Sequence, residues 1–230
     1  MRDAPGRDKR EPSRDLPGWW VRAPLARWLE EEGGRADGLR ILDVGCGVKP
    51  YLPFFSSARE YVGADVVANP HADVIAPIEQ LPFDDGAFDV VLCIQVLEHV
   101  DDPPLAVREL HRVCAPGGRV LASTHGTQVY HPSPVDYWRW THAGLDRLFL
   151  TNGEWRSVTV TPGAGTGACL AMLTAIYINL GAKRLQLVSV GKLAIRAVNR
   201  IGGAIDARSA LLRRPVPGAL IANLHVVAEK

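Results

Sequence analysis

The sequence predicts an α/β fold: a mostly parallel, seven-stranded sheet with helices on both faces and a helical insertion before the last strand. Three observations predict it. Short apolar runs alternate along the chain with segments of helical periodicity, which is the order of a parallel sheet. The run at 88–96 is continuously apolar, as expected for a central strand covered on both faces. A Gly-rich turn directly follows the first apolar run.

The elements of the first half can be assigned in order. A helix is expected with Pro24 in its first turn and Leu25, Trp28 and Leu29 on one face, ending at the two glycines 33–34. Apolar runs with turn residues between them then predict strands at 40–45, 60–66, 72–76 and 88–96. A short helix is expected near 51–57.

The second half continues the alternation. Asp102 is expected to cap a helix that opens with two prolines, and the Pro-Gly-Gly at 116–118 turns the chain into a strand at 119–125. A helix at 141–151, with Thr141 as its N-cap, precedes a strand at 157–161. Residues 165–213 are expected to be helical, and 220–230 form the last strand.

Composition limits the class of protein. Hydrophobic residues make up 47% of the 230 residues and charged residues 22%, which is ordinary for a globular protein. The net charge of +1 argues against a nucleic-acid partner, because proteins built to grip nucleic acid usually carry a strongly basic face. The four cysteines form no Cys-x-x-Cys pair, so neither a zinc site nor a disulfide framework is indicated. We therefore expect a cytoplasmic protein.

Two segments bear on domain organisation. Residues 1–18, rich in Arg, Asp, Pro and Gly, are expected to form a disordered tail, and 19–230 a single domain. The uncharged run at 163–182 reaches about the length of a membrane span. Its first six residues are only Gly, Ala and Thr, so a buried or interfacial helix is favoured over a transmembrane one.

The Gly-rich turn, "ILDVGCGVKPY" at 41–51, carries the clearest chemical signal. A dinucleotide site would have a third glycine where Pro50 stands, and Asp43 beside the turn would repel a pyrophosphate. Asp43 suits a cationic or zwitterionic ligand instead. Asp65 ends the second predicted strand, where a carboxylate typically accepts from ribose hydroxyls. A nucleoside with positive charge and no phosphate, S-adenosylmethionine, matches both carboxylates.

Four segments, "LDVGCG", "YVGADV", "LPFDDGAFDVVLCIQVLEHVDDP" and "ELHRVCAPGGRVLAS", resemble the class I S-adenosylmethionine-dependent methyltransferases, and more narrowly the type 11 group. The resemblance covers about 39–126 and implies their Rossmann-like fold. It places Asp43 near the methionine amino group, Asp65 on the ribose and Gln95 facing the methionine. The remaining implied cofactor contacts are Gly45, Cys46 and Gly47 in the turn, and Val66, Ile78 and Glu79 around the adenine. Pro77 stands where many relatives carry an Asp that accepts from the adenine.

The stretch "YHPSPVDYWRWTHAGL" at 130–145 follows the fifth predicted strand, so it belongs at the ligand edge of the sheet. Two interpretations are open. In one, Arg139 pairs with Asp136 and the loop caps the core. In the other, His131 is a general base oriented by Asp136, and the loop holds the acceptor through Tyr130, Tyr137, Trp138 and Arg139. Pro132 and Pro134 are expected to stiffen the loop.

His125, at the end of the fifth strand, and His99, after the fourth, are further candidates for the base. A His/Asp group could instead hold a divalent metal ion, but no metal-ligand spacing indicates one.

Three functions are open. The leading one is O-methylation of a small-molecule, saccharide or natural-product acceptor, a class favoured because similar appended helices occur among methyltransferases of glycan and natural-product pathways. The second is a protein or nucleic-acid methyltransferase, and the third a non-catalytic S-adenosylmethionine-binding interaction module. The insertion at 165–213 is interpreted as a lid over the site, a homodimer interface or a peripheral membrane contact, with a plain cap on the core as the alternative.

Overall fold

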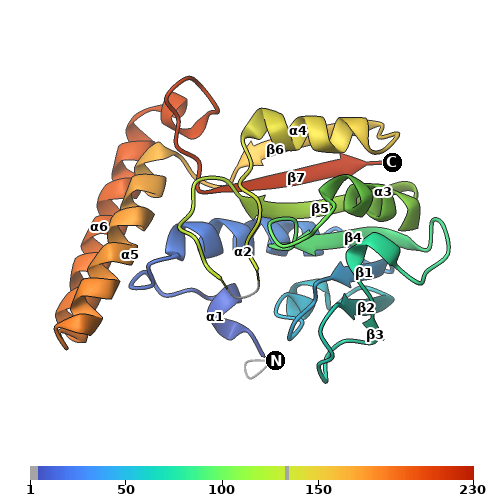
Figure 1. Cartoon of the computed structure of the whole chain (residues 1–230), viewed down its shortest axis with the longest axis horizontal. Helices are drawn as coiled ribbons and strands as arrows, with labels where there is room; N and C mark the ends of the chain where they lie inside the picture. Colours follow the sequence, from blue (N-terminus) through green and yellow to red (C-terminus); the bar gives the residue numbers. More distant parts are fainter. Residues whose placement is uncertain (1–4, 133–134) are drawn as a thin grey trace.

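A computed structural model describes residues 5–132 and 135–230 of the chain. Its centre is a seven-stranded sheet with the strand order β3-β2-β1-β4-β5-β7-β6 (Figure 1). The strands β1 to β5 run parallel, while β7 lies antiparallel between β5 and β6. Their bounds are β1 (Arg40–Val44), β2 (Glu60–Asp65), β3 (Val74–Ile75), β4 (Phe88–Ile94), β5 (Cys114–His125), β6 (Ser157–Pro162) and β7 (Asn223–Glu229). The predicted fold class is confirmed.

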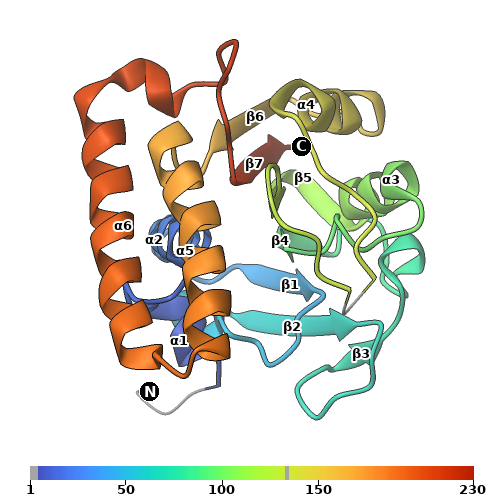
Figure 2. The ribbon, with the colours of Figure 1, turned by 60° about the vertical axis from the view of Figure 1, so that its left-hand side comes forward.

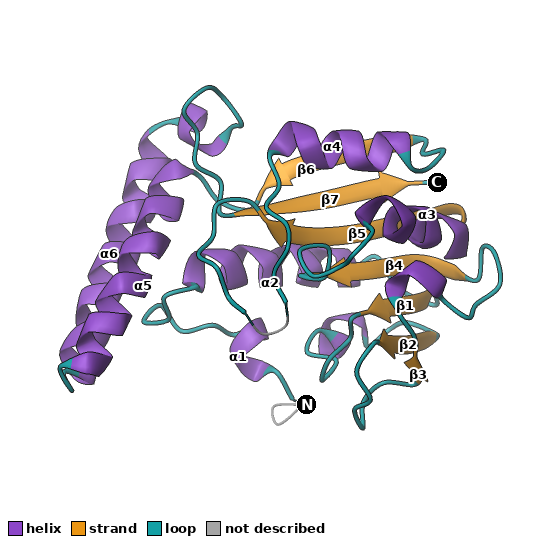
Figure 3. Cartoon of the chain, viewed as in Figure 1, coloured by secondary structure: helices purple, strands orange, loops and turns teal. Residues whose placement is uncertain are grey.

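Helices cover both faces of the sheet (Figure 3). On one face lie α3 (Pro103–Val113) and α4 (His142–Thr151). On the other lie α2 (Trp19–Gly33) and the short 3₁₀ turn η1 (Leu52–Phe55). Both predicted N-caps are confirmed: Asp102 accepts a hydrogen bond from the backbone N–H of Leu105, and Thr141 accepts one from Gly144.

Two elements, α2 and β5, begin well before their predicted starts. Helix α2 begins at Trp19, so Pro24 lies inside it rather than in its first turn. The added turn is stabilised by packing, because Trp20 and Val21 contact the helical insertion. Strand β5 begins at Cys114, which pairs with Phe88 of β4 before a register shift across the Pro-Gly-Gly segment. There the N–H of Gly117 (φ 79°) donates to the carbonyl of Lys230, just after β7.

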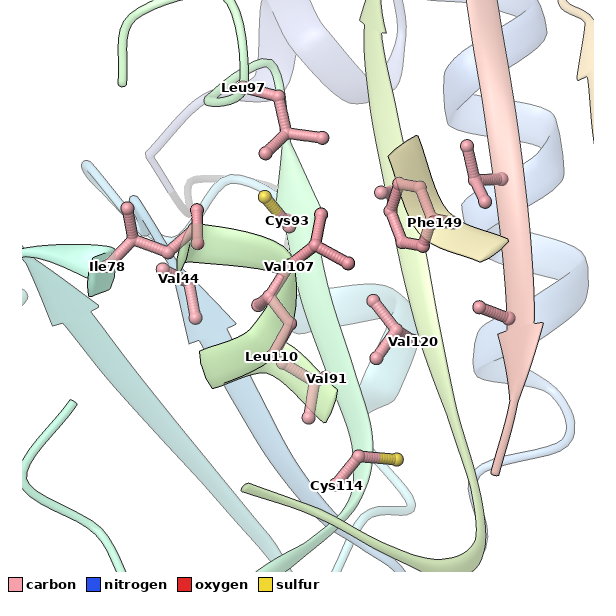
Figure 4. Close-up of a cluster of buried hydrophobic side chains, with 14 of the residues drawn as sticks. Val44, Ile78, Val91, Cys93, Leu97, Val107, Leu110, Cys114, Val120 and Phe149 are labelled. Atoms are coloured by element: carbon pink, nitrogen blue, oxygen red, sulfur yellow. The ribbon is translucent and has the colours of Figure 1, made fainter. Parts of the chain in front are cut away.

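The largest of the three core clusters described fills the space between the sheet and the helices α3 and α4. Figure 4 shows Val91 and Cys93 of β4 facing Val107 and Leu110 of α3. The fully buried Phe149 of α4 closes this cluster over Val120 of β5. The result is a rigid sheet whose parallel strands all end at one edge.

The N-terminal segment corrects the expectation of a disordered tail. Residues 5–18 include the short helix α1 (Arg7–Arg10) and pack on the domain. Asp8 pairs with Arg22 at 2.5 Å, and Arg10 donates a 2.5 Å hydrogen bond to the carbonyl of Pro50. The Nδ2 of Asn199 donates to the carbonyl of Arg14. Composition alone missed this order because the partners lie on distant parts of the chain. Residues 1–4 lie outside the described residues.

The insertion is helical, as predicted. It consists of α5 (Thr166–Arg184), α6 (Val188–Arg208) and the 3₁₀ turn η3 (Ala210–Arg213), and the two long helices lie side by side at one side of the domain (Figure 2). Small residues let them approach: a Cβ on Gly202 would meet the Cβ of Ala171 at 2.5 Å. No helix among the described residues is long and apolar enough to cross a membrane.

Candidate functional site

Two cavities lie at the edge of the sheet where the parallel strands end, and Gly45 lines both. The first has a volume of about 360 Å³. Its lining comes from the ends of three strands and the turns after them, and from parts of the N-terminal segment and α2. From the strand ends and turns come Asp43, Gly45, Cys46, Pro50, Tyr51, Gln95, His125 and Gln128. The second has a volume of about 190 Å³ and lies between the ends of β2 and β4. Ligands of open parallel sheets bind at this edge.

Asp43 is a buried carboxylate at the floor of the first cavity. Its Oδ2 accepts a 2.7 Å hydrogen bond from the hydroxyl of Tyr61. Burial raises the pKa of Asp43 to about 7, although the Tyr61 hydroxyl, Lys49 and Lys9 each lower it in part. Burial makes the ionised form of a carboxylate unfavourable, and a cation beside the carboxylate stabilises that form. The first cavity therefore suits a positively charged group near Asp43.

The turn after β1 is held open by its backbone. Gly45 (φ 69°) and Gly47 (φ 52°) both have left-handed backbone angles that favour glycine. A Cβ on Gly45 would lie 2.4 Å from the Cγ2 of Val96, so no larger residue fits there. Cys46 is buried, and Gly63 of β2 makes room for its sulfur. The turn thus exposes backbone, rather than side chains, to the first cavity.

Asp65 joins the end of β2 to this turn. Its Oδ2 accepts a 2.8 Å hydrogen bond from the N–H of Gly47, and its Oδ1 accepts one of 3.0 Å from the N–H of Val67. Each oxygen keeps a further lone pair, so the carboxylate can accept from a ligand hydroxyl as well. Asp65 lines neither of the two cavities, and its contact with a ribose stays a prediction.

The second cavity has a mixed lining of apolar side chains, carboxylates and a histidine. Val66, Ile78 and Glu79 line it together with Val96, Pro77 and His99. Sequence reasoning missed Asp101, which also lines this cavity. Pro77 offers no side-chain acceptor here, so Glu79 and Asp101 are the carboxylates that this cavity contains.

Gln95 closes the first cavity from the β4 side. It adopts a left-handed backbone angle (φ 58°), and its Nε2 donates to the Oγ of Ser123 at 3.0 Å and to the Oδ1 of Asn223 at 2.9 Å. The Nδ2 of Asn223 in turn donates to Ser123. This buried network fixes the amide of Gln95 at the cavity wall.

His125 and Glu98 form a buried pair beside the first cavity. The Nε2 of His125 lies 3.4 Å from the Oε1 of Glu98, and the Oε2 of Glu98 accepts a 2.8 Å hydrogen bond from the Thr124 hydroxyl. Burial raises the pKa of Glu98 to about 7 and lowers the pKa of His125 to about 3. The imidazole is therefore neutral near neutral pH. Within the described chain, its Nδ1 and the Oε1 of Glu98 are both buried without a hydrogen-bond partner, so the two side chains are close but not hydrogen-bonded.

The loop after β5 is built around Arg139. Its guanidinium pairs with Asp136 through both carboxylate oxygens, and its Nη2 also donates to the carbonyl of Val129. This ion pair keeps the pKa of Asp136 well below its usual range. The carboxylate reaches His131 only through the backbone N–H, at 3.1 Å; no hydrogen bond to the His131 ring is found among residues 5–132 and 135–230. The orienting role predicted for Asp136 is therefore corrected to a structural one within the loop.

The aromatic residues of the loop differ in their roles. Trp138 donates from Nε1 to the carbonyl of Val100, and Tyr137 and Trp138 donate backbone N–H groups to the carbonyl of Glu98. Tyr130 and Tyr137 are exposed, and neither they nor Trp138 or Arg139 lines either cavity. Pro134 lies outside the described residues.

Three histidines gather at this point. The ring of His131 lies 5.2 Å from that of His99 and 5.5 Å from that of His125, measured between centroids. His99 is tied by Nδ1 to the carbonyl of Val135, and burial lowers its pKa. Of the three, His125 lines the first cavity and His99 the second. In the part of the chain that the structure describes, no group of three or more His, Cys, Asp or Glu side chains could hold a metal ion.

Sequence reasoning missed the residues that close the first cavity. Lys9, Gly18, Val21 and Arg22 line it from the N-terminal segment and α2. No motif marks them, because their position depends on how that segment packs. Glu98 lies in the "LEHV" segment directly before His99, so it could have been named as a candidate site residue from the sequence.

Comparisons with known proteins agree with this geometry. A family model described as a methyltransferase domain matches residues 19–155. A ubiquinone biosynthesis O-methyltransferase of Pseudomonas aeruginosa (strain UCBPP-PA14) is 34% identical over 140 residues, covering 46% of this chain and 57% of that protein. A protein of the same name from Acinetobacter baylyi (strain ATCC 33305 / BD413 / ADP1) is 35% identical over 118 residues, covering 42% and 48%. The match thus spans about half the length of these relatives.

Solved structures share the fold. The cyclase SpnF matches with a TM-score of 0.58 and 18% identity, covering 92% of this chain and 82% of that one. An S-adenosylmethionine-dependent methyltransferase from Mesorhizobium loti matches with a TM-score of 0.53 and 17% identity, covering 92% and 100%. At such identities the likeness concerns the fold alone.

Proposed function

The chain belongs to the class I S-adenosylmethionine-dependent methyltransferases, and we propose that it methylates a hydroxyl group of a small-molecule acceptor with His125 as the general base. When bound, S-adenosylmethionine supplies an electrophilic methyl group and leaves as S-adenosylhomocysteine. The described residues fit this cofactor. Asp43 offers a buried carboxylate to its amino group, Asp65 an acceptor to its ribose, and the second cavity a lining for its adenine.

The observation that carries the proposal is the buried Nδ1 of His125 without a partner beside the first cavity. Buried polar atoms are usually hydrogen-bonded. Of the described residues with such an unpaired atom, His125 is the one that lines the first cavity, where a bound substrate could supply the partner. An acceptor hydroxyl would donate to the Nδ1 lone pair and pass its proton there as the methyl group is transferred. Phenols and sugars both carry such hydroxyls.

Glu98 sets which nitrogen of His125 is free to act. The Oε1 of Glu98 lies 3.4 Å from the Nε2 of His125 and has no hydrogen-bond partner among the described residues. When Glu98 is ionised, a slightly closer approach would let Nε2–H donate to this oxygen and leave the lone pair of Nδ1 available. When Glu98 is protonated, its own proton can bond to Nε2, and the ring proton moves to Nδ1. His125 then cannot accept from the substrate. We therefore assign Glu98 as a positioning residue for the base.

A small acceptor is favoured over a macromolecular one by the closure of the first cavity. The N-terminal segment and α2 contribute Lys9, Val21 and Arg22 to its lining, so the site lies beneath a covering layer. A base on duplex nucleic acid would have to be extruded to reach it. The names of the curated relatives, which are O-methyltransferases, also support a hydroxyl acceptor.

A labelling experiment tests this proposal. The full chain is incubated with S-adenosylmethionine carrying a labelled methyl group and separately with phenols, saccharides, hydroxylated natural products, protein and nucleic acids. We expect label in a hydroxylated small molecule. Label in nucleic acid or protein would favour the second candidate function. Cofactor binding without label in any acceptor would favour a non-catalytic module.

The pH dependence of turnover tests the role of Glu98. Because ionised Glu98 is needed to free Nδ1, and its pKa is about 7, we expect kcat to rise as the pH increases through about 7 and then to level off. In Glu98→Gln the amide oxygen can still accept from Nε2–H but does not titrate. This variant should have a lower kcat and lack the step near pH 7. A step that persists unchanged in Glu98→Gln would assign it to another group.

A further inference from the structure

The helices α5 and α6 form a pair that contacts the rest of the domain along one side only. Their inner side contacts the domain: Cys169 and Met172 pack with Val21, and Trp20 donates from Nε1 to the carbonyl of Asn199. At the end near η3, Asp206 accepts hydrogen bonds from the N–H groups of Gly165, Gly167 and Ala168. At the opposite end, where α5 turns into α6, no hydrogen bond or ion pair found within the described chain joins residues 180–193 to the rest of the domain, although Lys192 is close enough to Asp15 to help lower its pKa.

We call residues 180–193 the hairpin tip. Six large apolar side chains are exposed in it: Leu180, Leu185, Leu187, Val188, Val190 and Leu193. Leu185 and Leu193 each keep 67% of their surface exposed and Val190 keeps 62%. So many exposed apolar side chains in fourteen residues are unusual for a surface that meets only water.

The charged residues of the α5–α6 hairpin are almost all basic. Residues 166–214 contain eight Lys and Arg residues and one carboxylate, Asp206. That carboxylate is buried and engaged at the start of α5. The tip itself holds Lys183, Arg184 and Lys192 and no acidic residue. Among the ion pairs of the described residues, only Arg196, with Asp15, involves a basic side chain of this hairpin.

We propose that the hairpin tip docks on an anionic lipid surface. Apolar side chains flanked by Lys and Arg are the composition of helices that lie at a membrane interface, where the apolar groups enter the acyl boundary and the cations meet phosphate headgroups. The chain as a whole carries a net charge of only +1, so the attraction is local to the hairpin. The protein would thus bind peripherally, by its tip, without crossing the bilayer.

A second copy of the chain fits the tip less well than a lipid surface does. In a two-fold dimer the same patch is used on both subunits, so both copies of Lys183, Arg184 and Lys192 would enter one interface. The tip contains no carboxylate that could neutralise them. An anionic bilayer satisfies the apolar side chains and the cations together.

Vesicle sedimentation of the full chain tests the proposal. The vesicles are made either of phosphatidylglycerol with phosphatidylcholine or of phosphatidylcholine alone, at about 0.1 M and about 0.5 M salt, because salt screens exposed charges. We expect binding to the anionic vesicles that weakens at the higher salt, and much weaker binding to phosphatidylcholine alone.

Two tip variants and two matched controls locate the contact. Leu185→Glu/Leu193→Glu and Lys183→Glu/Arg184→Glu should each lower binding to anionic vesicles by about tenfold or more. The controls, Leu150→Glu and Arg147→Glu on the exposed side of α4, should leave it unchanged. Binding of S-adenosylhomocysteine confirms that each variant is folded.

Three results would contradict binding of the hairpin tip to a membrane. Absence of vesicle binding by the unmodified chain overturns the proposal, as does binding that the tip variants do not weaken. A concentration-dependent dimer that the tip variants dissociate, without vesicle binding, would assign the tip to a second copy instead.

Discussion

Replacing His125 with Gln is expected to lower the turnover of a hydroxyl acceptor by about 10²-fold or more, with little change in the affinity for S-adenosylhomocysteine. Gln can still bond to Glu98 but cannot take a proton from the acceptor. His125 does not belong to the turn that holds the cofactor, so binding of the product should persist. Single-turnover kinetics measures the first quantity and calorimetry the second.

Two matched variants separate His125 from its neighbours. His131→Gln and His99→Gln remove imidazoles whose rings lie close to the same point, but His131 lines neither cavity and His99 is tied to the carbonyl of Val135. Both variants should keep most of their turnover. If His131→Gln loses turnover while His125→Gln keeps it, the base is in the loop, as the sequence first suggested, and His125 is a packing residue.

The contrast between His125 and His131 shows where sequence reasoning reaches its limit. The loop at 130–145 is crowded with aromatic and ionisable residues, which suggests an active site. In the structure, however, Arg139 and Asp136 form an ion pair with each other. Their spacing of three residues is local, so this pairing could be anticipated. The contact of His125 with Glu98 joins the end of β5 to the turn after the neighbouring strand β4, and it depends on strand order and on side-chain direction.

The same distinction holds for the fold. The strands and the caps Asp102 and Thr141 follow from apolar runs and from residues next to one another in sequence. The turn at Gly45 and Gly47 was equally readable, because its conformation depends on local backbone angles. The order of the N-terminal segment could not be predicted from the sequence, because Asp8, Arg10 and Arg14 contact α2, Pro50 and α6, which lie elsewhere in the chain. Its cover over the first cavity is a tertiary property.

Replacing Asp43 with Asn is expected to weaken the binding of S-adenosylmethionine and S-adenosylhomocysteine by about 2–3 kcal/mol, or roughly 30- to 150-fold, because a charge-assisted hydrogen bond to the amino group is lost. Asp73→Asn serves as the matched control. Asp73 also lies near the end of β2 and pairs with Lys49, but it lines neither cavity. Calorimetry should find a much smaller loss for the control. An equal loss in both variants would point to a general disturbance of this edge rather than to a contact with the ligand.

The pH dependence of binding distinguishes the charge of Asp43 from its shape. With a pKa raised to about 7, Asp43 is largely protonated in the empty site at about pH 6 and ionised at about pH 8. A cationic amino group favours the ionised form and so lowers this pKa on binding. Binding below pH 7 must then displace a proton, and affinity should fall by up to about tenfold for each pH unit of acidification. Asp43→Asn has no proton to displace there, so its weaker affinity should stay nearly constant over the same range. A wild-type affinity that does not change between these pH values would mean that Asp43 does not meet the cation.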